Sequence, residues 1–403
     1  MRQTWRWFGP EDSVSTNDMR QAGVEGVVSA LHHIPNGAVW TIDEIEARQA
    51  QIAQFQCGRP SNLTWEVVES LPVSEDIKQQ SGQWRQHIEN YKLSLENLAQ
   101  CGLKVICYNF MPLLDWTRTD LAYTLANGAR CMRFDLIDFA AFDIHILKRK
   151  NARADFSEAV CVQADQRIRS MSEEAKLKLS RNIVCGLPGA EQGYTVEDLR
   201  AQIALYDRIS EDQFRQHQLD FLNEIVPLAE HHDLRMCCHP DDPPFSLLGL
   251  HRIMSSEEDY KQLTQAIDSP ANGITLCSGS LGVSAEVDLP GMMERLGDKV
   301  HFIHLRNVVR ESVGEQLSFY EAAHLEGETN MVSLIQAILN EENRRKLLSR
   351  VDCSIPFRPD HGQDILSDLT VNGQPGYPAV GRLKGLAELR GIMTALEVNA
   401  TAG

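Results

Sequence analysis

The chain has 403 residues, of which 43% are hydrophobic and 24% charged, a mixture that excludes wholesale disorder. Asp and Glu (56) outnumber Lys and Arg (39), and the formal net charge of −17 argues against nucleic acid and membrane as partners. The segment Met1–Trp7 lacks the apolar stretch of a secretion signal, and no run is long enough to span a membrane. The ten cysteines have no zinc-finger spacing, so we expect reduced thiols in a cytoplasmic protein.

Short, almost continuously apolar runs alternate with helical patterns along the chain. Such runs are typical of parallel strands that are buried on both faces. The expected strands are residues 26–31, 65–68, 105–108, 235–238, 274–277, 300–305 and 355–357, with an eighth near Cys131–Phe134. The expected helices between them include residues 42–56, 84–101, 260–267 and 331–345. About eight strands favour a closed (β/α)8 TIM barrel over an open doubly wound sheet.

One long segment interrupts this alternation. Residues 113–232 carry few strand signals, and charged amphipathic helices are expected at 154–181 and 196–232, broken by Gly186–Gly189 and Gly193. We therefore predict a single TIM-barrel domain over residues 1–403 with an approximate helical insertion at 113–232. The insertion would form a lid or an oligomer surface; the alternative is a set of extended ordinary barrel helices. A loop and helix at 376–395 are expected to close the fold.

Four polar residues at the ends of late strands indicate a metal site. His239, Cys277, His304 and Asp360 each stand where an expected strand runs into its loop, which is where TIM barrels carry their chemistry. Two imidazoles, a thiolate and a carboxylate suit a divalent transition metal. Each residue also has a structural interpretation: a buried histidine, a small apolar cysteine, or a turn acid.

Further polar residues follow other strands. Arg306 lies two residues after His304, so both side chains can share one face; it is a candidate clamp for a substrate carboxylate, or part of a salt bridge beneath the barrel rim. Cys238 should point away from the face that carries His239. Asp241 and Asp242 are interpreted as turn acids beside prolines. No nucleotide-binding glycine motif follows a strand.

At these strand ends the sequence resembles the mannonate dehydratase family of xylose-isomerase-like barrels. The segments that carry the resemblance run in order along almost the whole chain. They are Trp5–Trp7, Ala30–Gly37, Cys107–Pro112, Leu114–Thr119, His239–Pro244, His304–Arg306, Arg358–Gly362 and Gly381–Leu386.

The resemblance implies dehydration of D-mannonate to 2-keto-3-deoxy-D-gluconate, in hexuronate catabolism, with Mn²⁺ or Fe²⁺. It makes His239, Cys277, His304 and Asp360 the metal ligands. It assigns acid–base work to His361 and Tyr377, and the sequence leaves open which is acid and which is base. We expect the substrate to be held by polar residues at the same barrel end. These are Arg306, His32, His33, Asn36 and Asn109.

Other functions remain as alternatives. A metal-dependent sugar isomerase or epimerase of the same barrel type would typically use several acidic ligands, and Glu69 is the one glutamate found at a strand end. A non-catalytic sugar-acid-binding barrel would have no need of His361 and Tyr377. A barrel endonuclease is disfavoured by the acidic balance. We expect a homo-oligomer with a small sugar acid as its ligand.

Overall fold

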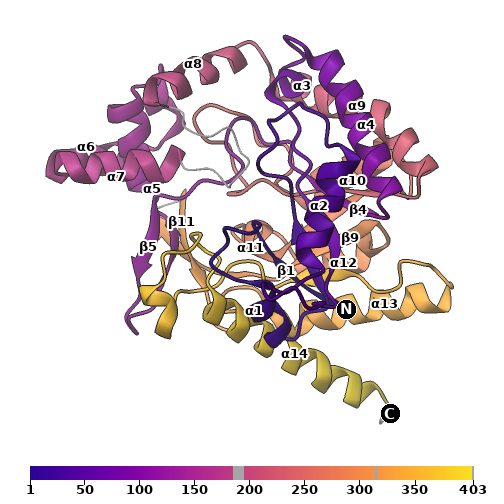
Figure 1. Ribbon diagram of the computed structural model, residues 1–403. Helices are drawn as coiled ribbons and strands as arrows, with labels where there is room; N and C mark the ends of the chain where they lie inside the picture. Colours follow the sequence, from indigo (N-terminus) through magenta and orange to yellow (C-terminus); the bar gives the residue numbers. More distant parts are fainter. Residues whose placement is uncertain (185–194, 314–315, 402–403) are drawn as a thin grey trace.

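Eight parallel strands form a closed barrel, as predicted. The computed structural model describes residues 1–184, 195–313 and 316–401. Neighbouring barrel strands run in the order β1-β12-β9-β8-β7-β4-β3-β2, and helices surround them (Figure 1). The barrel strands are β1 (Arg2–Arg6), β2 (Gly26–Ser29), β3 (Thr64–Glu69), β4 (Val105–Tyr108), β7 (Arg235–Cys238), β8 (Asn272–Cys277), β9 (Val300–His304) and β12 (Pro356–Arg358).

The eighth barrel strand is not the predicted one. Cys131–Phe134 does form a strand, β6 (Arg130–Phe134), but β6 belongs to a different sheet. The barrel is closed instead by β1, which pairs with β2 and β12. Sequence reasoning missed β1 because three of its five residues are Arg2, Gln3 and Arg6, and such a strand does not appear as an apolar run.

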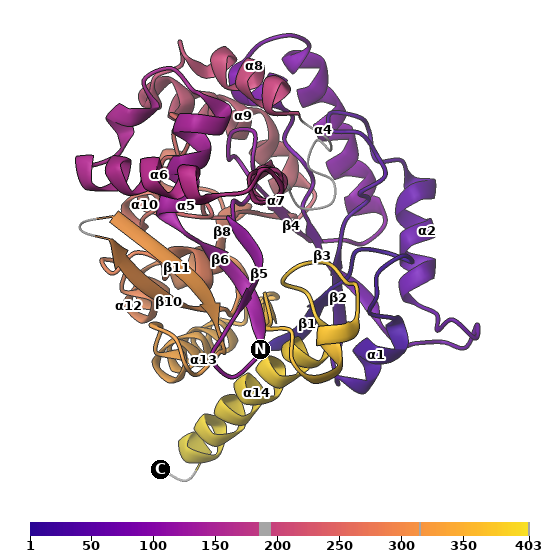
Figure 2. The ribbon, with the colours of Figure 1, turned by 90° about the vertical axis from the view of Figure 1, so that its left-hand side faces the viewer.

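A four-stranded antiparallel sheet lies beside the barrel (Figure 2). Its order is β10 (Asn307–Val313), β11 (Gln316–Ala322), β6 and β5 (Asp120–Thr124), so two segments distant in sequence build it together. Residues 113–232 therefore contain two strands as well as helices. The predicted breaks at Gly186–Gly189 and Gly193 lie outside the described residues.

The remaining elements are helical. Between β6 and β7 run α5 (Leu136–Ala141), η1 (Phe142–Leu147), η2 (Ala152–Asp155), α6 (Glu158–Ser170), α7 (Glu173–Val184), α8 (Val196–Tyr206) and α9 (Glu211–His231). The others are α1 (Thr16–Gln21), α2 (Ile42–Ile52), α3 (Glu75–Gln79), α4 (Trp84–Gln100), α10 (Glu257–Ala266), α11 (Ser278–Leu281), α12 (Leu289–Leu296), η3 (Gly297–Lys299), α13 (Met331–Leu347), η4 (Leu366–Thr370) and α14 (Ala379–Thr401).

Side-chain caps explain where several helices begin. Ser256 accepts a hydrogen bond from the Asp259 N–H in a capping box, so α10 starts at Glu257, three residues before the expected start. Ser210 and Gln213 make the same arrangement at the start of α9. No helix in the described chain is long and apolar enough to cross a bilayer.

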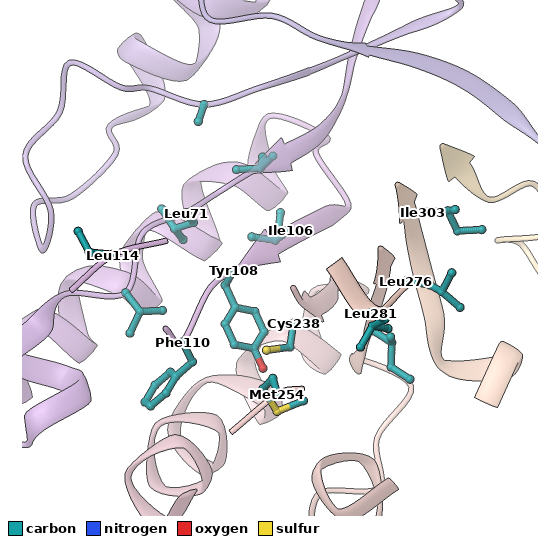
Figure 3. Close-up of a cluster of buried hydrophobic side chains, with 14 of the residues drawn as sticks. Leu71, Ile106, Tyr108, Phe110, Leu114, Cys238, Met254, Leu276, Leu281 and Ile303 are labelled. Carbon is teal, nitrogen blue, oxygen red and sulfur yellow. The ribbon is translucent and has the colours of Figure 1, made fainter. Parts of the chain in front are cut away.

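Strand residues alternate between the barrel interior and the outer core. Cys237 lies in the interior cluster, which is completed by Val28, Val67, Cys107 and Phe302. Its neighbour Cys238 packs outside, near Tyr108 and Met254, as the close-up shows (Figure 3). The prediction that Cys238 points away from the His239 face is confirmed. The same alternation aims the residues at the carboxyl ends of the strands into the barrel mouth.

Candidate active site

Four predicted ligands meet at the carboxyl ends of adjacent strands. His239, Cys277 and His304 follow or end β7, β8 and β9, and one donor atom from each lies within 4.8 Å of the others. His239 Nε2 is 3.1 Å from His304 Nδ1. Asp360, just after β12, places Oδ2 3.7 Å from Cys277 Sγ and 4.0 Å from His304 Nδ1. The arrangement fits one divalent cation with nitrogen, sulfur and oxygen ligands.

The protonation states of these groups also suit a cation. The Nδ1 of His239 lies 2.6 Å from the Pro240 carbonyl and donates to it, which leaves the Nε2 lone pair facing the cluster. Burial, and then repulsion from His304, lowers the pKa of His239 to about 4, so its ring is neutral. Burial raises the pKa of Cys277 to about 12, against the influence of Arg306. A bound cation must therefore displace the Cys277 thiol proton.

An arginine holds two carboxylates against this cluster. Arg358 donates from Nε and Nη2 to Glu69 at 2.9 and 2.7 Å, and from Nη1 to Asp360. Burial alone would raise the pKa of Asp360, but Arg358 and other nearby cations hold it well below its usual value. Glu69 Oε1 lies 3.4 Å from His304 Nε2, on the side of the ring away from Asp360. Asp360 is thus ionised, and carboxylates lie near both nitrogens of the His304 ring.

Comparison with known proteins places this site in a family. The family model described as D-mannonate dehydratase (UxuA) matches residues 1–402. The mannonate dehydratase of Rhizobium meliloti (strain 1021) is 55% identical, over 100% of this chain and 98% of that protein. Mannonate dehydratase 1 of Agrobacterium fabrum (strain C58 / ATCC 33970) is 52% identical, over 98% and 97% of the two chains. The chain belongs to the D-mannonate dehydratase family. It is therefore a hydro-lyase that acts on a sugar acid.

Solved structures agree with the fold of this dehydratase. The crystal structure of mannonate dehydratase from Streptococcus suis serotype 2 matches with a TM-score of 0.75 at 29% identity, covering 99% of this chain and 96% of that one. A xylose isomerase domain protein from Planctomyces limnophilus matches with a TM-score of 0.50 at 9% identity, covering 100% and 99%. The second likeness concerns the barrel alone.

The two predicted acid–base residues of the dehydratase touch each other. His361 Nε2 is 3.3 Å from the Tyr377 hydroxyl, and the rings meet edge to face. Burial raises the pKa of Tyr377 to about 12, although Arg358 opposes the shift, so the phenol keeps its proton at neutral pH. Phe8 packs against the other side of Tyr377, with ring centroids 4.8 Å apart.

The other ring nitrogen of His361 faces two groups of opposite charge. Arg306 Nη1 lies 2.9 Å from His361 Nδ1, and Glu321 Oε1 lies 3.1 Å from the same atom. An arginine only donates and an ionised glutamate only accepts. A neutral Nδ1 lone pair is therefore satisfied by Arg306, and a protonated Nδ1 is satisfied by Glu321. Both protonation states of the imidazole have a partner.

Arg306, a predicted substrate clamp, is enclosed by carboxylates of the protein. Its Nη2 donates to Asp242 at 2.8 Å, and its Nη1 lies 3.4 Å from Asp360 Oδ2. Arg118 completes a buried network by bonding Asp242 at 2.8 Å and Glu321 at 2.9 Å. Arg306 thus makes the salt bridge that sequence reasoning had weighed as an alternative to the clamp.

The four remaining predicted residues are placed differently from one another. His32 stacks at 5.6 Å from Phe8, and its Nε2 is buried without a hydrogen-bond partner in the described chain. His33 instead pairs with Glu44 at 2.8 Å, with 53% of its side chain exposed. Asn36 and Asn109 are half-buried in the loops after β2 and β4. The structure brings His32 toward Tyr377 through Phe8 and turns His33 to the surface.

Sequence reasoning missed several groups of this site. Arg358 ends β12 and stands two residues before Asp360, so the period-two spacing that links His304 with Arg306 also indicates Arg358. Asp242 was interpreted as an ordinary turn acid. Glu321 comes from the β10–β11 hairpin, and no local pattern connects it with His361.

Proposed function

We propose that this enzyme dehydrates D-mannonate to 2-keto-3-deoxy-D-gluconate with a divalent metal held by His239, Cys277, His304 and Asp360. The observation that carries the proposal is the convergence of these four donor groups beside the His361–Tyr377 pair. The bound metal supplies Lewis-acid stabilisation of negative charge on substrate oxygens. Four protein ligands would close a tetrahedral Zn²⁺ site, so Mn²⁺ or Fe²⁺, which accept more ligands, fit better.

His361 and Tyr377 would carry the two proton transfers. The reaction takes a proton from C2 and expels the C3 hydroxyl as water, so it needs one base and one acid. His361 has hydrogen-bond partners for both of its protonation states, and Tyr377 keeps its proton at neutral pH. We propose that one of the two residues takes the C2 proton as the base and that the other protonates the departing C3 hydroxyl as the acid.

Substrate positioning would fall to polar groups around the same barrel mouth. His32 is favoured by its unpartnered Nε2, and Asn36 and Asn109 by their half-buried places after β2 and β4. Arg306 would orient His361 and contribute positive charge, since its donors already meet Asp242 and His361. His33 would contribute to substrate positioning only indirectly, because it lies in the same loop as His32 and Asn36.

Cellular context completes the proposal. We infer a cytoplasmic homo-oligomer that serves hexuronate (glucuronate) catabolism, with neither nucleic acid nor membrane as a partner. The acidic net charge of −17 and the reduced cysteines support this inference, because the described cysteines are free thiols.

Metal reconstitution tests the function directly. The enzyme is stripped of metal, reloaded anaerobically with Mn²⁺ or Fe²⁺, and supplied with D-mannonate, with epimeric sugar acids as controls. We expect metal-dependent formation of a 2-keto-3-deoxy acid. A keto sugar acid or an epimer without loss of water would identify an isomerase or epimerase instead. Tight binding of mannonate without turnover in the loaded protein would identify a binding protein.

A further inference from the structure

A cavity with several charged residues in its lining lies at the opposite mouth of the barrel from the proposed metal ligands. It has a volume of about 510 Å³ and is lined by residues that begin strands, among them Val105 of β4, Arg235 of β7 and Pro356 of β12. His301, near the start of β9, also lines it. His301 lies three positions before His304, roughly 10 Å along a strand. The dehydration chemistry makes no use of this cavity.

Two β-bulges turn polar residues toward this end of the barrel. The register between β2 and β3 skips Glu66, and the register between β8 and β9 skips His301. Each extra residue faces a glycine on the neighbouring strand: a Cβ at Gly26 would lie 2.9 Å from Glu66 Cβ, and a Cβ at Gly273 would overlap the His301 ring. Bulges re-aim side chains in this way beside binding sites.

His301 is buried in this cavity with no partner for its ring. It is 4% exposed, and neither Nδ1 nor Nε2 has a hydrogen-bond partner among the described residues. Burial, and then repulsion from Arg345 and Arg235, lowers the pKa of His301 to about 3, so the ring is neutral. A neutral imidazole offers one N–H and one lone pair. Leaving both unused in the interior is energetically unfavourable, which points to a ligand that would occupy them.

The charges around the cavity favour an anion. Lys104 donates to the His232 carbonyl at 2.8 Å, and Arg235 donates to the Leu234 carbonyl at 3.2 Å, so neither cation is bonded closely to a carboxylate. The Arg235 Nε is buried without a hydrogen-bond partner in residues 1–184, 195–313 and 316–401, and the nearest carboxylate contact is 3.9 Å long.

The acidic groups of the lining are neutralised or peripheral. Glu66 pairs with Arg2 at 2.6 Å, and Asp352 pairs with Arg350 at 2.6 Å. Asp233 is exposed at the rim of the cavity.

We propose that this cavity binds a small oxyanion that also carries a hydroxyl group. Arg235 and Lys104 would neutralise the anion, the His301 N–H would donate to one of its oxygens, and the His301 lone pair would accept from its hydroxyl. Hydrogen phosphate and a short hydroxy acid share this chemistry. The site is separate from the metal ligands, so it does not depend on the proposed reaction.

Calorimetric titration of the metal-loaded enzyme with inorganic phosphate, and separately with D-lactate, tests the proposal. We expect at least one of the two to bind, and we expect Arg235→Gln and His301→Phe each to weaken that binding about tenfold, because the first removes a positive charge and the second removes both hydrogen-bonding groups of the ring. Phosphate alone would assign the site to phosphate, and lactate alone to a hydroxy acid. Mannonate turnover should be unchanged in both variants.

Two controls separate this site from others. Lys92→Gln, which removes a cation paired with Glu224 on the surface, should leave the binding unchanged. Asp360→Asn, which alters the metal ligands, should leave it unchanged too. Absence of binding at millimolar concentration of either probe, or binding that survives Arg235→Gln and is lost in Asp360→Asn, would overturn the proposal.

A structural measurement covers the case in which the variants fail to fold. Crystals of the unaltered enzyme are soaked with arsenate, a phosphate analogue that scatters anomalously. A peak between His301 and Arg235 supports the site. The proposed anion site is rejected if the crystals show no peak in the cavity and neither phosphate nor lactate binds in solution.

Discussion

The Nδ1 atom of His361 lies between a cation and an anion of the protein. Arg306 is 2.9 Å away and Glu321 is 3.1 Å away, so Nδ1 has a partner in either state: Glu321 accepts from its N–H, and Arg306 donates to its lone pair. With the proton on Nδ1 and Glu321 as its acceptor, the Nε2 lone pair can take up a proton without movement of the imidazole. Such preorganisation suits a residue that moves protons, because the surroundings do not have to rearrange during the reaction.

Replacing His361 by asparagine should abolish most of the turnover. Asparagine keeps a polar group at this position but cannot take up or release a proton near neutral pH, so kcat should fall about 10²–10⁴-fold. Bound metal, measured by elemental analysis, should stay near one equivalent. Near-normal turnover by the variant would remove His361 from the acid–base pair.

Two buried cysteines provide a matched test of the metal ligands. Cys277→Ser replaces the proposed thiolate by a hydroxyl, and we expect at least a tenfold loss of metal affinity. Cys238→Ser makes the same chemical change on a side chain that packs in the outer core, and its metal content should be unchanged. Equal metal content in the two variants would exclude Cys277 as a ligand.

Strand-end residues could be predicted from the sequence because their positions are local. The position of His304, a proposed ligand, follows directly from the end of an apolar strand and the alternation of side chains. Glu321 and Asp242 could not be predicted to lie in the site, because their neighbours come from segments far away in the chain. His33 shows another limit: its sequence position at a strand end does not reveal that the ring pairs with Glu44 at the surface.

At the scale of elements, the accessory sheet joins the two halves of the chain. Phe134 of β6 stacks on Phe319 of β11 with ring centroids 5.7 Å apart, and the Arg118 guanidinium lies 4.9 Å from the Phe319 ring. Phe319 and Glu321 are two residues apart on β11 and therefore share a face. The aromatic stack thus supports the strand that carries the partner of His361.

Truncating Phe319 should therefore affect both stability and turnover. Phe319→Ala should lower the free energy of unfolding by about 3–5 kcal/mol, because it leaves a cavity in a fully buried cluster. It should also lower kcat at saturating metal through displacement of Glu321. Phe319→Leu, which keeps most of the volume, should restore most of both. Full activity of the alanine variant would show that the stack does not position Glu321.

Element types were easier to predict than their partners. Seven barrel strands follow from apolar runs, but the strand at Cys131–Phe134 pairs with β11 rather than entering the barrel. A hydrophobic pattern identifies a strand without specifying its neighbour. β1 is the reverse case. Its hydrophobic pattern is weak because Arg2 and Arg6 stand at its ends, and it forms a strand because it pairs with β2 and β12 on either side.

For the whole molecule, buried ion pairs near the site make stability depend on pH. Burial would raise the pKa of Glu321, but Arg306, His361 and Arg118 lower it from 4.5 to about 2. A carboxylate with a lowered folded-state pKa stabilises the fold above its unfolded pKa, and this contribution disappears as the pH falls through the folded value. The Glu321 contribution should therefore be complete above about pH 5 and decline toward pH 2.

Unfolding by urea at several pH values measures this contribution. A shift of this size corresponds to about 3 kcal/mol at neutral pH, as an upper estimate. The difference in free energy of unfolding between the natural enzyme and Glu321→Gln should be largest at neutral pH and should narrow at pH values below about 4. A difference that is constant over this range would show that Glu321 does not titrate as an ion-paired group.

The two-part origin of the accessory sheet has a consequence for how the enzyme becomes active. β5 and β6 are synthesised well before β10 and β11, and β7, β8 and β9 lie between the two pairs in sequence. A chain that ends before residue 316 lacks the strand that carries Glu321, and a chain that ends before residue 360 lacks Asp360, the last of the proposed metal ligands. The active site can therefore form only after the whole chain has been synthesised. During refolding, activity should return only when the last pairing between distant segments, such as β6 with β11, has formed.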